Sequence, residues 1–159
     1  MRAETLPEAE AHLWVARPSE IRDPELILAY DALLTEDERA KVSRYRFEKD
    51  RHTSLVTRAL VRTVLSRYAA VSPEDWRFIA NEFGRPEISE PGGERSLRFN
   101  LSHTEGLVVC LVSRDREVGV LGETFQHDPI RTKRRREVDE TLLVLEQVEN
   151  QKEIGRAHV

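Results

Sequence analysis

The segment at residues 97–113, LRFNLSHTEGLVVCLVS, decides the fold class of this chain. It contains two short segments, residues 97–101 and 107–113, that are predicted to be strands. Polar residues 114–116 follow directly and predict the turn of a hairpin. This hairpin would lead into one more strand over residues 117–121. The segment therefore predicts a group of neighbouring strands.

Three helices are predicted upstream of these strands. Asp23 followed by Pro24 is the pattern of a helix N-cap and a first helical residue. Thr35 and Glu38 have the spacing of a capping box, which predicts the start of a second helix. A third helix, over residues 50–69, has apolar side chains at helical spacing. Its arginines are expected to lie mainly outside that apolar stripe: Arg51, Arg58, Arg62 and Arg67.

Two further strands complete the predicted order of elements. Residues 12–16 and 76–80 have the short apolar pattern of strands. Residues 83–86, Phe-Gly-Arg-Pro, predict a turn that leads into an extended segment. Helices followed by several strands predict an α+β fold. The 159 residues are enough for about one domain or two very small ones.

The composition is typical of a soluble globular protein. Hydrophobic residues make up 39% and charged residues 34% of the chain, and no run approaches the roughly 18 apolar residues of a membrane span. The N-terminus lacks the apolar core of a secretory signal. Cys110 is the single cysteine, which excludes an internal disulfide, and its apolar neighbours predict a small core residue. These features predict a cytoplasmic protein without a membrane partner.

Charge is distributed unevenly along the chain. Between residues 39 and 67 there are nine basic and two acidic residues, a local excess of +7. Residues 1–123 carry 18 basic and 22 acidic residues in total, so the part of this range outside residues 39–67 has a net charge of −11. This pattern indicates a small phosphate-rich ligand or an acidic partner, or else a solvated helix face whose charges pair locally. The overall net charge of −4 argues against a dedicated nucleic-acid-binding protein.

Three motifs in this order resemble those of the 4′-phosphopantetheinyl transferase superfamily. They are residues 83–86 (FGRP), residues 99–104 (FNLSHT) and residues 118–123 (VGVLGE). The basic helix upstream, with RYRF at residues 44–47 and RALVR at residues 58–62, is also similar to the family. Each motif is short, but their order and spacing make the resemblance fairly specific. It covers roughly residues 10–123.

The resemblance implies a fold and an activity. The family fold pairs two similar α+β halves about a pseudo-twofold axis, with coenzyme A between them. Its members transfer the 4′-phosphopantetheine arm of coenzyme A to a serine of an acyl or peptidyl carrier protein, with Mg²⁺, and release 3′,5′-ADP. This chain would supply the N-terminal half. The expected domain organisation is an α+β half over residues 1–118, the start of a second half over residues 119–123, and a helical tail over residues 124–159 that is foreign to the family.

Several residues take roles by this resemblance. Lys41 is a phosphate contact from the second helix, and Arg85 meets the nucleotide end of coenzyme A. Asn100, Ser102 and His103 are expected near the phosphates, with His103 as a cation or hydrogen-bond donor. Ser102 and His103 are not a nucleophile–base pair, because neighbours on an extended segment point to opposite sides.

The third motif departs from the family pattern. The family usually places an Asp and a Glu there as Mg²⁺ ligands, whereas this chain has Leu121 and Glu123. Glu123 alone is expected to hold the metal weakly, and this loss would cost much of the activity. The absence of a second half within 159 residues predicts an incomplete, impaired transferase.

The tail, residues 124–159, has two features of its own. Residues 137–153 predict an amphipathic helix, and residues 154–159 resemble a translated sequencing adapter, which would make the tail an artefact. One alternative function is a catalytically inactive module that binds coenzyme A or 3′,5′-ADP. A weaker alternative is nucleic-acid contact through the basic residues of 131–136.

Overall fold

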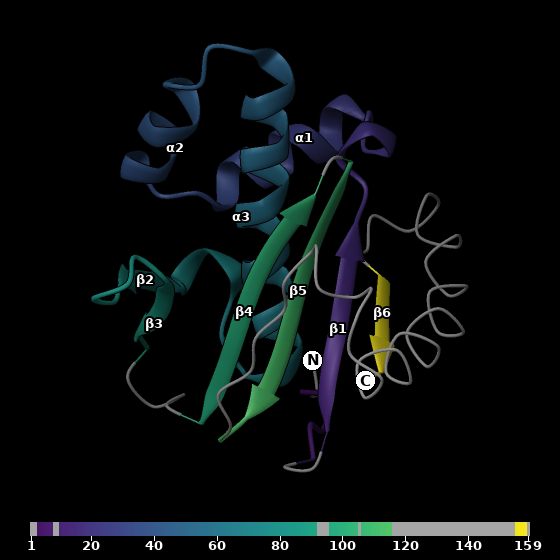
Figure 1. Cartoon of the computed structure of the whole chain (residues 1–159), viewed down its shortest axis with the longest axis vertical. Coiled ribbons are helices and arrows are strands. Elements are labelled where there is room, and N and C mark those ends of the chain that lie inside the picture. The colour runs from purple at the N-terminus through teal and green to yellow at the C-terminus, as the bar shows by residue number, and fades with distance from the viewer. Residues whose placement is uncertain (1–2, 8–9, 92–95, 105, 116–154, 159) are drawn as a thin grey trace.

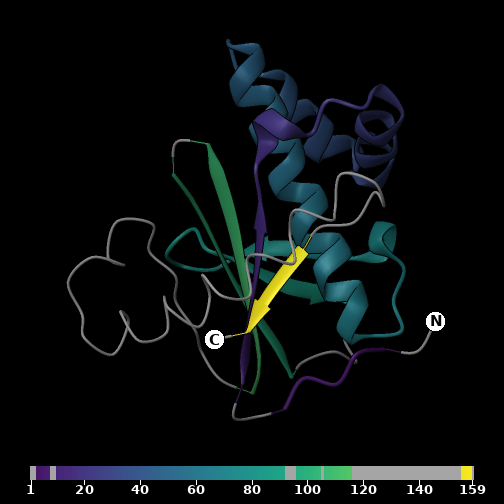
Figure 2. The ribbon, with the colours of Figure 1, turned by 90° about the vertical axis from the view of Figure 1, so that its right-hand side faces the viewer.

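The computed structural model describes residues 3–7, 10–91, 96–104, 106–115 and 155–158. These residues form an α+β fold, which confirms the predicted fold class, with an antiparallel sheet and helices on one of its sides (Figures 1 and 2). The strands of this sheet, in spatial order, are β4 (Leu97–Thr104), β5 (Leu107–Arg114), β1 (Ala11–Ala16) and β6 (Gly155–His158). A separate two-stranded sheet pairs β2 (Arg77–Ala80) with β3 (Pro86–Glu90).

The predicted starts of the first two helices are confirmed, and the third helix begins two residues before its predicted start. α1 spans Pro24–Leu33, and the Asp23 side chain accepts a hydrogen bond of 3.0 Å from the backbone N–H of Glu25. α2 spans Glu36–Ser43 and begins with the predicted capping box of Thr35 and Glu38. α3 spans Glu48–Tyr68, and short 3₁₀ turns occupy Pro18–Glu20 and Pro73–Asp75. None of the described helices is long and apolar enough to cross a bilayer.

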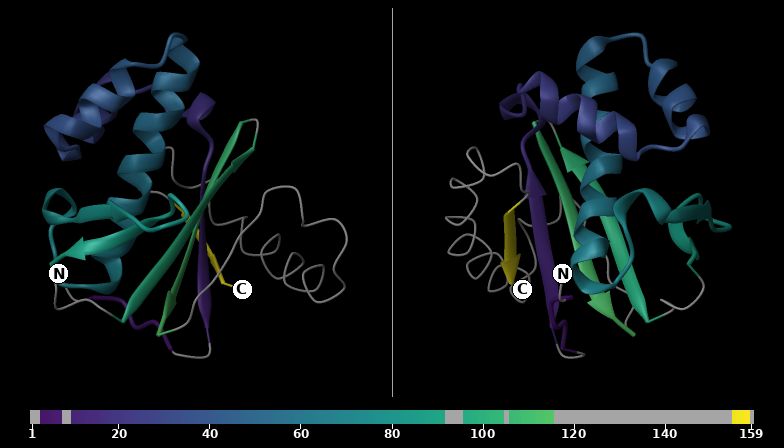
Figure 3. Two further views of the ribbon diagram at one scale, coloured as in Figure 1. Left: turned by 60° about the vertical axis from the view of Figure 1, so that its left-hand side comes forward. Right: turned by 180° about the vertical axis from the view of Figure 1, so that it is seen from behind.

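The core lies between α3 and the main sheet, and Figure 3 shows α3 against one side of that sheet. β5 sits between β4 and β1, and residues 108–113 are all buried. The apolar stripe of α3 packs toward it, with Leu60 and Leu65 fully buried. Cys110 is fully buried, which confirms it as a core residue. Burial raises the pKa of its thiol, so no reactive thiolate is available there.

A buried polar network fixes the end of α3 against β1. The Tyr68 hydroxyl accepts a hydrogen bond of 2.9 Å from Trp14 Nε1 and lies 2.7 Å from His12 Nδ1. His12 Nε2 lies 3.1 Å from a carboxylate oxygen of Glu10. Since these buried polar atoms have partners, the network holds α3 at a defined position along β1 without an unpaired donor at these contacts.

The expectation for Arg62 is wrong. The sequence places this residue outside the apolar stripe of α3, whereas only 1% of its surface is exposed. Its guanidinium donates to the carbonyl oxygens of Pro73 (3.0 Å) and Trp76 (2.7 Å) and to the Glu38 carboxylate (2.6 Å). These partners come from other elements of the fold, and they compensate the cost of burying the charge.

The tail also differs from its prediction where the structure describes it. Gly155–His158 forms the strand β6, antiparallel to β1, although the sequence of the tail has no strand signal. Pairing at the edge of β1 uses main-chain donors and acceptors, which require little side-chain pattern. The predicted strand at 117–121, the helix at 137–153, the basic residues 131–136 and Glu123 lie outside the described residues.

Candidate functional site

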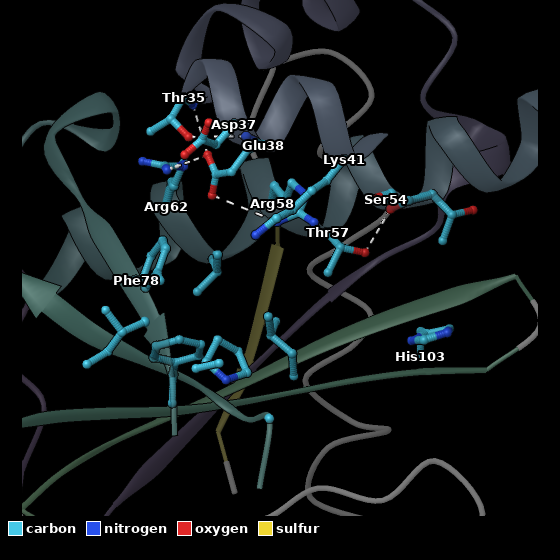
Figure 4. Close-up of a pocket in the computed structure, with 18 of the residues that line it drawn as sticks. Thr35, Asp37, Glu38, Lys41, Ser54, Thr57, Arg58, Arg62, Phe78 and His103 are labelled. Carbon is cyan, nitrogen blue, oxygen red and sulfur yellow. Dashed lines mark hydrogen bonds and ion pairs between the residues drawn. The ribbon is translucent and has the colours of Figure 1, made fainter. Parts of the chain in front are cut away.

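A cavity of about 690 Å³ opens where α2 and α3 face the β2–β3 hairpin and β4 (Figure 4). Its volume falls within the range of small-molecule sites. The walls are mixed. Helices α2 and α3 contribute mostly polar and charged side chains, and the strands contribute apolar ones, such as Phe78 and Phe99, together with Arg77 and His103. A ligand with a charged part and an apolar or aromatic part fits such a lining.

Two cations from the helices line this cavity side by side. Lys41 comes from α2 and Arg58 from α3, and their side chains lie close together in Figure 4. Neither side chain makes a hydrogen bond within the part of the chain that the structure describes. The nearest carboxylate of Arg58 is Glu38, 3.9 Å from Nη1, and the Nε of Arg58 is buried without a partner in that part. These unfilled donors suit an anionic ligand.

The inner wall beside these cations is a paired set of charges. Glu38 Oε2 accepts hydrogen bonds from Arg62 Nη2 at 2.6 Å and from the backbone N–H of Thr35 at 2.9 Å. The guanidinium of Arg62 also lies over the ring of Phe78, with 5.3 Å between its carbon and the ring centroid. The Nη atoms of Arg62 are therefore engaged by the protein itself, while its Nε, like that of Arg58, has no partner among the described residues. The ammonium group of Lys41 and the Nη atoms of Arg58 make no hydrogen bond there.

β4 brings only part of the predicted site to the cavity. This strand continues to Thr104, so His103 lies within the strand rather than beyond its end. Phe99, Leu101 and His103 line the cavity, and Figure 4 shows His103 across from Lys41 and Arg58. Asn100 and Ser102 alternate with them, so they point to the other face of the sheet. The same alternation separates the side chains of Ser102 and His103, as predicted.

Arg85 occupies the turn between β2 and β3. The side chain of Asn81 accepts hydrogen bonds from the backbone N–H groups of Phe83 (2.9 Å) and Arg85 (3.0 Å) and so shapes this turn. Gly84 has a φ of +76°, in the left-handed region that glycine adopts at little cost. Gly84 and Pro86 line the cavity, but the Arg85 side chain is not part of the lining. The structure therefore brings Lys41 and His103 together at one cavity and leaves Arg85, Asn100 and Ser102 beside it.

Sequence reasoning missed Arg58 and Glu38 as members of the site. It identified Glu38 as a helix cap, and it placed Arg58 in the basic segment and in the family-like stretch of residues 58–62 without naming it as a site residue. The available signal was spacing: Arg58 and Arg62 are four residues apart and share a helix face. Glu38, the capping-box glutamate of α2, is an acidic residue in the preceding helix that could pair with these two arginines.

No metal site is apparent in the described ranges. They contain no group of three or more His, Cys, Asp or Glu side chains that could hold a metal ion. The predicted ligand Glu123 lies outside them.

Comparison with known proteins gives consistent matches. A family model described as "4′-phosphopantetheinyl transferase, N-terminal" matches residues 20–116. The chain is 33% identical over 120 residues to the 4′-phosphopantetheinyl transferase HetI of Nostoc sp., covering 73% of this chain and 48% of HetI. It is 33% identical over 115 residues to a phosphopantetheinyl transferase of Thraustochytrium sp., covering 72% of this chain and 40% of that protein. The chain thus spans less than half the length of either relative.

A solved structure is also similar to this one. It is the Helicobacter pylori holo-[acyl-carrier-protein] synthase in complex with coenzyme A, with a TM-score of 0.48 and 13% identity. The match covers 65% of this chain and 98% of that one.

Proposed function

The chain belongs to the 4′-phosphopantetheinyl transferase family, and from this premise we propose that it binds coenzyme A in the cavity between α2, α3 and β4. The bound coenzyme A would donate its phosphopantetheine arm to a serine of an acyl or peptidyl carrier protein. The observation that carries the proposal is the pair of cations Lys41 and Arg58, whose donors remain unfilled in the described residues and line this cavity. His103 faces them from β4.

The chemistry of coenzyme A matches this arrangement. It carries a 3′-phosphate and a pyrophosphate, and each needs positive charge and hydrogen-bond donors. In the proposed transfer, the serine oxygen forms a bond to the β-phosphorus, the bond from that phosphorus to the bridging oxygen breaks, and 3′,5′-ADP leaves. The serine proton passes to a general base. Lys41, Arg58 and His103 would bind and orient the phosphates.

Magnesium and Glu123 belong to the proposal as expectations. Mg²⁺ would neutralise charge on the pyrophosphate when it is bound, and Glu123 would be one of its ligands. Leu121, where the family usually has Asp, is expected to weaken that binding. Arg85 is proposed as an outer contact rather than as a residue of the cavity wall. Asn100 and Ser102 point to the other face of β4, so they are not proposed as contacts of a ligand in this cavity. The expected compartment is the cytoplasm.

The direct test combines binding and transfer. Calorimetric titration with coenzyme A and with 3′,5′-ADP is expected to show saturable binding to the purified chain. Incubation with coenzyme A, Mg²⁺ and an apo carrier protein is then followed by mass spectrometry for addition of phosphopantetheine. Addition supports the transferase, whereas binding without addition supports the coenzyme A-binding module instead. Absence of binding to either nucleotide contradicts the proposal.

Lys41→Ala is expected to weaken binding of 3′,5′-ADP by about tenfold, because it removes a charge-assisted contact worth about 1.5 kcal/mol. Arg39→Ala is the matched control, because Arg39 is another cation of α2 that does not line the cavity and pairs with Asp31 at 3.2 Å. The affinity of the Arg39→Ala variant for 3′,5′-ADP is expected to stay within about twofold of the wild-type value. Equal losses for the two variants would show that only the overall charge of α2 matters.

A further inference from the structure

Helix α2 carries Lys41 but has no fully buried side chain over its whole length, all of which the structure describes. Its neighbour α3, in contrast, buries a continuous stripe that includes Leu60 and Leu65. Val42 packs against the core only partly buried. Burial of apolar side chains therefore contributes little to holding α2 in place, since hydrophobic stabilisation scales with the apolar area buried. Another interaction must hold the helix at the cavity.

Glu38 is the side chain that makes this connection. It is 14% exposed, and its Oε2 accepts from the Arg62 guanidinium at 2.6 Å. Arg62 is itself held by the carbonyl oxygens of Pro73 and Trp76. Glu38 also completes the cap of α2 through the backbone N–H of Thr35. The first turn of α2 is thus tied to a rigid, buried point of α3.

We propose that Glu38, held by Arg62, is a positioning residue that places Lys41 at the cavity and so sets the affinity for the anionic ligand. Glu38 and Lys41 are three residues apart on α2, so they share a helix face, and both line the cavity. A change in the tilt of the first turn would therefore displace Lys41. The inference rests on the proposed function, because it takes the ligand to be the phosphates of coenzyme A.

The charge of Glu38 alone would have the opposite effect on binding. Its carboxylate lines the cavity, and its Oε1 lies 3.9 Å from Arg58 Nη1. As a negative charge near the ligand, it repels phosphate, so its neutralisation would raise affinity if positioning did not matter. The direction of the change in affinity therefore distinguishes a positioning role from a purely electrostatic one.

Glu38→Gln is the decisive variant. Glutamine can also complete a capping box, so the substitution removes the ion pair with Arg62 while it preserves the cap. The dissociation constant for 3′,5′-ADP is expected to rise by up to about tenfold, the size of the loss expected for Lys41→Ala, because displacement of α2 would remove the same contact. In the Lys41→Ala background, the same substitution is expected to change affinity by less than about twofold, because the two residues act as one unit.

A ligand-free measurement keeps the inference separate from the proposed function. Amide hydrogen exchange of Glu38→Gln is expected to accelerate in α2, while the centre of α3 stays protected. Glu36→Gln is the matched control, since Glu36 lies in the same turn and does not line the cavity. It is expected to leave both the exchange and the affinity unchanged.

The outcomes separate cleanly. Unchanged exchange in α2, tighter binding by Glu38→Gln, or full additivity with Lys41→Ala would each overturn the positioning role. If the wild type binds neither coenzyme A nor 3′,5′-ADP, the proposed function fails, and faster exchange in α2 would still show that Glu38 fixes the helix.

Discussion

Replacement of Arg62 by alanine is expected to lower the free energy of unfolding by about 3–5 kcal/mol. Arg62 is 1% exposed, and its guanidinium joins the Glu38 carboxylate to the carbonyl oxygens of Pro73 and Trp76. The substitution removes these hydrogen bonds, opens a cavity beside Phe78 and leaves the carboxylate of Glu38, itself 14% exposed, without its shortest partner. Each of these changes destabilises the folded state.

Urea denaturation followed by circular dichroism measures this loss. Arg77→Ala is the matched control, because the Nη1 of Arg77 also donates to the carbonyl of Trp76, at 2.9 Å, but the side chain is exposed. Arg77→Ala is expected to lower the free energy of unfolding by about 0.5 kcal/mol or less. If Arg62→Ala costs less than about 1 kcal/mol, the buried ion pair does not stabilise the junction of α2 and α3.

The parts of the fold that the sequence predicted are those with local causes. The caps of α1 and α2 depend on Asp23, Thr35 and Glu38, whose partners lie within three residues, so the motif already contains the interaction. The burial of Arg62 could not be read in this way. Its acceptors are 11, 14 and 24 residues distant in the sequence, and only the packed structure brings them together.

Only some of the predicted site residues line the cavity, and the reason again lies in the three-dimensional structure. A motif names residues that follow one another, whereas a strand sends alternate residues to opposite faces. Asn100, Ser102 and His103 therefore could not all face one cavity once β4 extended as a regular strand to Thr104. Arg58 was missed because a cation on an amphipathic helix looks like any other solvated charge. The role proposed for it depends on α2, which brings Lys41 beside it at the cavity.

Arg58→Ala is expected to weaken binding of coenzyme A by roughly 10- to 150-fold, because a hydrogen bond to a charged group contributes about 1.5–3 kcal/mol. The Arg58 side chain is 28% exposed and lines the cavity, so water screens its charge less than at an open surface. Its guanidinium makes no hydrogen bond within the described residues, and its ion pair with Glu38 is long at 3.9 Å, so phosphate oxygens would compete with one weak contact only.

Calorimetric titration of Arg58→Ala with coenzyme A and with dephospho-coenzyme A identifies the phosphate that Arg58 contacts. If the partner is the 3′-phosphate, the loss appears with coenzyme A and not with the dephospho form; if it is the pyrophosphate, both ligands lose affinity. Arg67→Ala is the control: Arg67 lies on the same helix with 29% of its side chain exposed, pairs with Glu4 at 3.1 Å and lies outside the cavity. It is expected to keep wild-type affinity within about twofold. Wild-type affinity in Arg58→Ala would remove Arg58 from the site and leave Lys41 as the proposed phosphate contact from the helices.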